Sequence, residues 1–278
     1  HHFAAIAGAA PIIGPVVAIS LWGWAPSILW IVLGCILLGA VHDFGSLIIS
    51  VRHKGASIGN ISGEVISERA RFLFSGFVWL ALILLIAVFV FFLARTYTEK
   101  PPVVLPSIGL IPLAIIMGVI LYKFQIKESV TIGLSLIIII LLIMAGEHFP
   151  LYLGKESLTI WIIVLLGYCF ISSVLPVEIF LQPLGYVCGL FLFGGIIFGI
   201  GGLIWLHPRM NIPFYLGWKS QIGLLWPLLF VTIACGAISG FHSLVASGTT
   251  SKQLANEKDA RKIGYGGMLM DCLLYTSP

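Results

Sequence analysis

Residues 232–257 carry the side chains best suited to chemistry, in the order TIACGAISGFHSLVASGTTSKQLANE. The segment begins apolar and then admits a histidine and several hydroxyl side chains before any charge, with glycines between them. Within a membrane, irregular backbone survives only where protein or a water-filled cavity satisfies its polar groups. The pattern therefore predicts a helix that breaks around a polar solute. We expect its contacts to come from Ser239, His242, Ser243, Ser247, Thr249 and Thr250.

Asp43 is an acidic residue inside the apolar run GAVHDFGSL, with His42 beside it. A charge at the centre of a bilayer costs about 2.5–3.5 kcal/mol on insertion scales, so such a residue is a functional candidate by default. Asp43 could bind a proton or a cation. The alternative is a carboxylate at a helix end that reaches Arg52 or Lys54.

A second group of candidates lies at the start of the chain. His1 and His2 precede an apolar segment that contains Pro11, Gly14 and Pro15. The two histidines either line a pathway beside a broken helix or lie among lipid headgroups. Because proline and glycine interrupt helices, we expect this first segment to break at these residues.

Composition places these residues in a membrane. Of 278 residues, 59% are hydrophobic and only 9% are charged, whereas soluble domains carry about 25% charged residues. The chain is therefore predicted to be an all-α polytopic membrane protein. The net charge of +4 comes from residues in short loops, so it does not indicate nucleic-acid binding.

About eight segments are long and apolar enough to cross a bilayer. They are residues 3–22, 27–51, 72–94, 108–122, 129–146, 158–175, 184–206 and 222–246. The first and the last are broken by Gly or Pro. Residues 4–14 and 232–240 resemble each other, which indicates either an inverted-repeat transporter architecture or a chance similarity between glycine-rich segments.

Loop charges give the orientation. Ten of the 15 Lys and Arg residues lie on one side when the loops are counted alternately. The positive-inside rule then places the loop 52–71 and the tail 252–262 in the cytoplasm. We also expect a short surface helix in the loop 52–71 and an extended, proline-rich connector over 95–106.

Motifs of soluble enzymes are not found in the sequence. It contains no Walker A loop, HExxH, GxSxG or CxxC pattern, and most of its cysteines lie inside apolar runs. We therefore expect no enzyme activity, no cofactor and no metal site.

Four stretches resemble the carbon starvation protein A (CstA) family. They are HHFAAIAGAAPIIGP at 1–15, GAVHDFGSLIISVRHKGASIG at 39–59, SSVLPVEIFLQP at 172–183, and the block from 232 to 270 that ends GGMLM. The resemblance implies an inner-membrane protein of bacteria or archaea that is linked to carbon starvation and to uptake of peptides or, in some relatives, of pyruvate with protons. It also implies a transmembrane domain over 1–270 that is truncated at both ends.

The chain departs from the family pattern at three places. Leu184 and Gly185 stand where the family has an Arg-Asp pair, and His42 stands where the family has Gln. Asp271 matches an acidic position of the family pattern, whereas the ending CLLYTSP that follows it does not resemble the family. We interpret residues 271–278 as a truncated or non-native tail.

These observations predict a multi-pass secondary transporter of the cytoplasmic membrane. Its partners would be a peptide or a small carboxylate such as pyruvate, a coupling ion expected to be a proton, and the lipid bilayer. Two alternatives remain: a nutrient sensor without transport, and a redox protein that binds haem or metal. The redox protein would use His1, His2, His42 and His242.

Overall fold

The computed structural model describes residues 2–7, 9–123, 128–154, 157–174, 181–207 and 211–276. The chain divides into two compact units. The first unit joins His1–Phe72 to Leu192–Pro278, and the second unit is Leu73–Phe191. All the candidate residues predicted from the sequence belong to the first unit.

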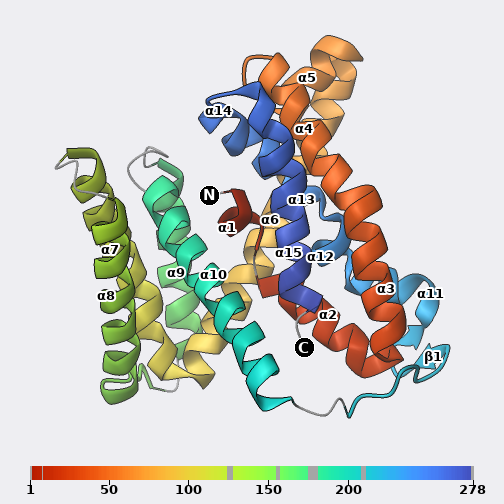
Figure 1. The fold of residues 1–278 in the computed structure, drawn as a ribbon. Coiled ribbons are helices and arrows are strands. Elements are labelled where there is room, and N and C mark those ends of the chain that lie inside the picture. Colours follow the sequence, from red (N-terminus) through yellow and green to blue (C-terminus); the bar gives the residue numbers. More distant parts are fainter. Residues whose placement is uncertain are drawn as a thin grey trace. The chain divides into compact units, whose positions relative to one another are not determined.

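The first unit begins with a series of helices (Figure 1). They are α1 (His2–Ile6), α2 (Ala9–Trp22), α3 (Trp24–Gly34), the π-helical turn η1 (Cys35–Gly39), α4 (Ala40–Arg52) and α5 (Ile58–Val65). Since α3, η1 and α4 run on without interruption, they form one 29-residue apolar helix, Trp24–Arg52. A π-helical turn adds a residue to one turn and often occurs at functional sites. Here it lies directly before the turn that carries Asp43.

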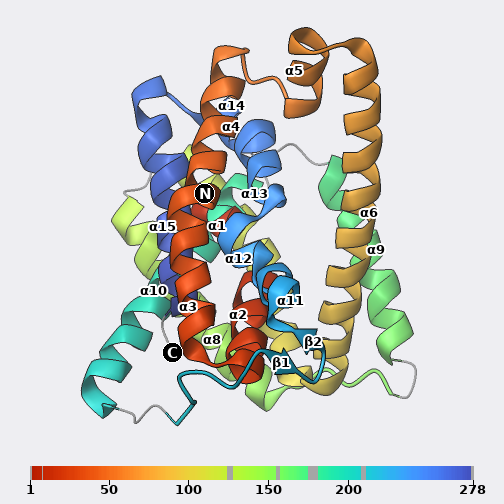
Figure 2. The same ribbon diagram turned by 90° about the vertical axis from the view of Figure 1, so that its right-hand side faces the viewer.

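The chain of the first unit resumes after α10 with a small hairpin and a series of short helices. These are β1 (Lys219–Ser220), β2 (Gly223–Leu224), α11 (Leu225–Thr232), α12 (Ala234–Ile238), α13 (Gly240–Val245), η3 (Ala246–Thr250) and α14 (Ser251–Gln253). They are followed by η4 (Glu257–Asp259), η5 (Arg261–Tyr265) and α15 (Gly266–Thr276). Figure 2 shows α11, α12 and α13 following one another beside α2 and α4.

The second unit is made of long helices. It contains most of α6 (Glu68–Glu99), then η2 (Pro101–Val103), α7 (Val104–Lys123), α8 (Glu128–His148), α9 (Ser157–Val174) and the beginning of α10 (Leu181–Leu206). Leu113, Met117 and Ile139 form a core between α7 and α8, and Leu184 of α10 packs against it. Leu184 thus lies in an apolar contact.

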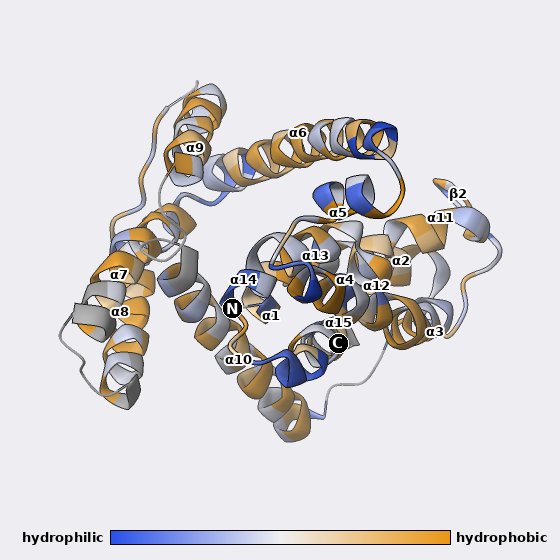
Figure 3. Cartoon of the chain, turned by 90° about the horizontal axis from the view of Figure 1, so that it is seen from above, coloured by the Kyte–Doolittle hydropathy of each residue, from blue (hydrophilic) through white to orange (hydrophobic). Residues whose placement is uncertain are grey.

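Among the residues that the structure describes, five helices are long and apolar enough to cross a membrane: Trp24–Arg52, Glu68–Glu99, Pro101–Gly118, Ser157–Val174 and Pro183–Leu206. Two shorter apolar helices are Ile12–Trp22 and Gly133–His148. Together with the interrupted segment 225–253, they correspond one to one to the eight predicted segments. Hydrophobic residues extend along α6, whereas α5 also carries hydrophilic residues (Figure 3). The prediction of a helical, multi-pass membrane protein is confirmed, and the inverted repeat stays a prediction.

The last predicted segment is broken, as expected. Ile233 and Ser239 leave the helical conformation, with backbone angles of φ −95°, ψ 0° and φ −58°, ψ 122°. They separate α11 from α12 and α12 from α13. The surface helix expected in the loop 52–71 is α5, whose N-cap Ser57 accepts a hydrogen bond from the backbone of Asn60.

Two expectations about proline are wrong. The first segment is interrupted, but the interruption lies between α1, which ends at Ile6, and α2, which begins at Ala9 and runs through Pro11, Gly14 and Pro15. The residues 95–106 are not an extended connector, because α6 continues to Glu99 and η2 and α7 follow almost at once. Pro11 and Pro101 lie in first turns, where a missing N–H costs no helical hydrogen bond.

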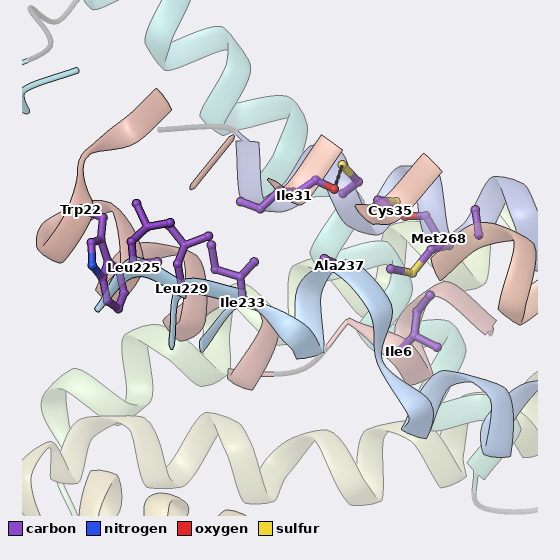
Figure 4. Close-up of a cluster of buried hydrophobic side chains, with 12 residues drawn as sticks. Ile6, Trp22, Ile31, Cys35, Leu225, Leu229, Ile233, Ala237 and Met268 are labelled. Carbon is purple, nitrogen blue, oxygen red and sulfur yellow. Dashed lines mark hydrogen bonds between the residues drawn. The ribbon is translucent and has the colours of Figure 1, made fainter. Parts of the chain in front are cut away.

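A buried apolar core surrounds the interrupted segment (Figure 4). Its members come from α1, α2, α3, η1, α4, α11, α12 and α15, and include Ile6, Trp22, Ile31, Cys35, Leu225, Leu229, Ile233, Ala237 and Met268. Small residues bring the backbones close together. A Cβ atom at Gly14 would overlap the carbonyl oxygen of Thr232, and one at Gly39 would overlap that of Ala237. Such close approaches are typical of helices packed in membranes.

Replacing Gly39 by Ala is expected to destabilise the protein by about 1–3 kcal/mol, because the added methyl group meets a backbone carbonyl that cannot move aside. The matched control is Gly45→Ala on α4, where a Cβ meets nothing within 4 Å. Thermal unfolding of the purified full-length protein in detergent measures both. Equal Tm values for the two variants would contradict the close packing of η1 against α12.

Candidate functional site

Asp43 and His242 form a buried pair in the first unit. Asp43 lies in the first turn of α4, directly after η1, and His242 lies on α13, directly after the break at Ser239. Asp43 Oδ2 is 3.4 Å from His242 Nδ1, and both side chains are 1% exposed. The pair therefore joins two irregular points of the backbone, η1 and the break at Ser239.

The pair is poorly compensated by its surroundings. Neither carboxyl oxygen of Asp43, nor Nε2 of His242, has a hydrogen-bond partner in the part of the chain that the structure describes. The nearest contacts are Met268 Sδ, 3.1 Å from His242 Nδ1, and the half-exposed His42, whose Nδ1 is 3.8 Å from Asp43 Oδ1. A buried carboxylate without compensation is costly, whereas a shared proton converts the two groups into an ion pair or a neutral pair. The arrangement is therefore suited to holding a proton.

A second buried contact ties the beginning of the chain to the interrupted segment. His2 Nδ1 of α1 is 3.0 Å from Thr250 Oγ1 of η3, and both residues are buried. This hydrogen bond brings two of the residues predicted from the sequence together across 248 positions. His1 lies outside the described residues.

Hydroxyl groups connect α4 to η3 and α14. Ser50 Oγ is 2.7 Å from the carbonyl oxygen of Ala56, 3.0 Å from that of Ser247 and 2.9 Å from Ser251 Oγ. A serine hydroxyl has one proton, so it donates to one of these groups at a time. Asp43 and Ser50 lie on the same buried face of α4, and this face meets α13 and η3 along a polar seam.

The remaining predicted residues are placed differently. Ser243 donates to the carbonyl of Gly240 at 2.8 Å, and Ser247 donates to that of Ser243 at 2.9 Å. These hydroxyls are thus engaged within their own helix. Ser239 is buried at the break, where its Oγ is 3.7 Å from Cys235 Sγ. Thr249 is half-buried, and no described residue makes a hydrogen bond with its side chain.

The residues on α2 do not meet the Asp43–His242 pair. Gly14 packs against the backbone of Thr232, at the end of α11. Pro11 belongs to the first turn of α2. The structure therefore gives Gly14 a packing contact and brings Asp43, His242, His2 and Thr250 into two buried polar contacts.

Sequence reasoning missed several polar residues of this region. Asp271 on α15 is fully buried, and the rule that singled out Asp43, an acid within an apolar run, would have found it in MLMDCLL. The sequence does not mark Ser50 and Met268 as candidate site residues, because serine and methionine are common in membrane helices. Among the described residues, no group of three or more His, Cys, Asp or Glu side chains is placed to hold a metal ion.

Thr250→Val keeps the size of the side chain but leaves His2 Nδ1 buried without its partner. We expect a loss of about 1–3 kcal/mol in the free energy of unfolding. Thr249→Val is the matched control and should change it by less than about 0.5 kcal/mol. Chemical denaturation of the full-length protein in detergent compares the two. A larger effect at Thr249 would contradict the assigned hydrogen bond.

The comparisons with known proteins agree on one family. The family described as carbon starvation protein CstA matches residues 1–276. The chain is 38% identical to a protein of Escherichia coli (strain K12) named pyruvate/proton symporter BtsT, over 98% of this chain and 39% of the relative. It is 36% identical to proteins named peptide transporter CstA from Campylobacter jejuni and from Escherichia coli, in each case over 98% of this chain and 40% of the relative.

The chain spans about two fifths of the length of these curated relatives. No solved structure matches it. Because the match covers nearly the whole chain at more than 30% identity, the chain belongs to the carbon starvation protein CstA family.

Proposed function

We propose that the chain is part of a proton-coupled secondary transporter for small carboxylates or peptides. The observation that carries this proposal is the buried Asp43–His242 pair beside an interrupted helix. Ionisable residues within membrane helices mark ion pathways by default, and discontinuous helices frame the sites of many secondary transporters.

The pair couples a proton to helix packing. With a proton on His242, the two side chains attract each other across 3.4 Å in a site without water-exposed surface. Without it, the Asp43 carboxylate lies buried beside a neutral ring. The free energy of packing α4 against α13 therefore depends on whether the proton is bound, and a transporter needs such a dependence for coupling.

Relatives support the choice of solute. One is named a pyruvate/proton symporter and others are named peptide transporters. Pyruvate and peptides share a carboxylate group. Hydroxyl groups such as that of Thr250, on the interrupted segment, are suited to binding that group.

In this proposal Asp43 and His242 carry the proton, and His2 and Thr250 lie next to the solute pathway. One wall of that pathway is formed by the interrupted segment, which contains Ser239, Ser243, Ser247 and Thr249. Gly14 supports that wall through its contact with α11, and Pro11 starts the helix that carries Gly14.

We place the protein in the cytoplasmic membrane, with the loop 52–71 and the tail 252–262 in the cytoplasm. An ion pair supports the assignment of both stretches to one side. Arg52 Nε is 2.8 Å from Glu257 Oε1, and both side chains are exposed. These two stretches lie far apart in sequence, and the loop-charge count assigns them to the same face independently.

Replacing Asp43 by Asn removes the group that we assign to the proton. The test uses proteoliposomes that contain the full-length protein, with an imposed pH gradient. Accumulation of labelled pyruvate or dialanine should fall about tenfold or more, which is the factor that a typical coupling free energy produces. Exchange of solute without a gradient should persist, because it needs no net proton movement.

The control is Glu64→Gln, which neutralises an exposed carboxylate on α5 and should leave accumulation unchanged. Undiminished gradient-driven accumulation by the Asp43→Asn protein would remove Asp43 from the coupling role. Failure of the wild-type protein to accumulate either solute would overturn the transporter proposal itself.

A further inference from the structure

We propose that a cavity beside the His2–Thr250 contact binds the carboxylate group of the solute, with Lys262 as its counter-charge. The inference rests on the proposed function and adds to it a location and a preferred class of solute. That class is a small carboxylate without an ammonium group.

The cavity lies within the first unit and has a volume of about 350 Å³. Its polar lining comes from His2 on α1, Thr250 on η3, Gln253 on α14 and Lys262 on η5. Part of its apolar wall consists of Phe3 and Phe193, whose ring centroids are 5.0 Å apart. Small-molecule sites commonly have this size and this combination of an apolar wall with a few convergent polar groups.

Three polar residues of the cavity, His2, Gln253 and Lys262, can donate hydrogen bonds to a solute, whereas the hydroxyl proton of Thr250 goes to His2. Lys262 supplies a cation, and no carboxylate lies among the described lining residues. When Thr250 donates to His2 Nδ1, the His2 proton is on Nε2, which then becomes a donor as well. Gln253 contributes its amide N–H groups. A lining of donors with one positive charge favours an anion.

Two of these donors lack a partner. His2 Nε2 and Gln253 Nε2 are buried, and neither has a hydrogen-bond partner among the described residues. An unsatisfied buried donor costs about 1–3 kcal/mol, so such groups usually have an acceptor. The two oxygens of a carboxylate would satisfy both donors while Lys262 balances the charge.

The absence of an acidic residue from the described lining also bears on peptides. A peptide or amino acid carries an ammonium group that needs an acceptor or a counter-charge. The lining offers Lys262 as its charged residue and apolar side chains such as Leu254 and Met270. A carboxylate with a short uncharged remainder therefore fits better than a zwitterion.

The cavity and the proton pair are distinct but connected. Asp43 and His242 do not line the cavity. His242 lies on α13, which runs directly into η3 with Thr250. A change in the packing of α13 thus reaches the cavity through one short segment of the chain.

Lys262→Gln removes the charge from the cavity. In equilibrium binding to the full-length protein in detergent, it should weaken binding of pyruvate about tenfold, the effect of one hydrogen bond to a charged group. Binding of pyruvamide, which lacks the carboxylate, should stay weak and equal in both proteins. Lys258→Gln, an exposed residue outside the cavity, is the control, and Lys262→Arg should keep most of the affinity.

Each outcome decides between stated possibilities. Equal pyruvate affinity of the Lys262→Gln and Lys258→Gln proteins would overturn the proposed site. The transporter proposal would still stand in that case if the wild-type protein accumulates pyruvate in proteoliposomes. Tighter binding of dialanine than of pyruvate would overturn the preferred class of solute. Equal competition by inorganic phosphate, or loss of pyruvate binding in nanodiscs with phosphatidylglycerol, would assign the site to phosphate groups instead.

Gly267 is a positioning residue for His2. A Cβ atom at Gly267 would lie 2.8 Å from His2 Cδ2, so Gly267→Ala must displace the ring. We expect the KM for pyruvate uptake to rise about tenfold, the effect of one lost hydrogen bond to a charged group, while the maximal rate is kept. Gly266→Ala, where a Cβ meets nothing within 4 Å, should change neither. A fall in the maximal rate at unchanged KM would contradict this role.

Discussion

The first unit depends on one constraint, which is that an interrupted helix inside a membrane needs protein around its broken backbone. Ile233 and Ser239 both leave the helical conformation, and lipid offers no partner to any backbone group that such a break frees. The helices α2, α3 and α15 and the turn η1 therefore pack around α12. Glycines at positions 14 and 39 allow this packing, because each meets a backbone carbonyl of the interrupted segment. The break in the helix thus depends on the helices packed around it, and this close packing depends on the glycines that face the interrupted segment.

Apolar length predicted the plain helices well, whereas single residues were harder to interpret. The runs that became α6 and α9 are hydrophobic on all sides, so their type and extent follow from composition alone. Proline misled because its effect depends on its position in a helix: Pro11 and Pro101 occupy first turns. A break was predicted over 236–250, where glycines and polar side chains occur together. The structure confirms a break within this stretch at Ser239 and adds an earlier one at Ile233.

The site was predictable as a set of residue types but not as a set of contacts. Asp43 and His242 each stood out as polar residues in apolar runs, yet nothing in the sequence pairs them across 199 positions. Arg52, the alternative partner considered for Asp43, instead binds Glu257. Lys262 was counted only for orientation, and a count of loop charges contains no information about the direction in which one lysine points.

The hydroxyl of Ser50 allows α4 and η3 to shift without a net loss of hydrogen bonds. Its single proton has acceptors on Ala56, Ser247 and Ser251 within 3.0 Å. Rotation about one side-chain bond exchanges one acceptor for another within this buried seam. A seam made of such exchangeable bonds resists separation of the two segments but offers little resistance to sliding. Exchange of acceptors thus allows small relative shifts of α4 and η3 while the Ser50 hydroxyl stays hydrogen-bonded.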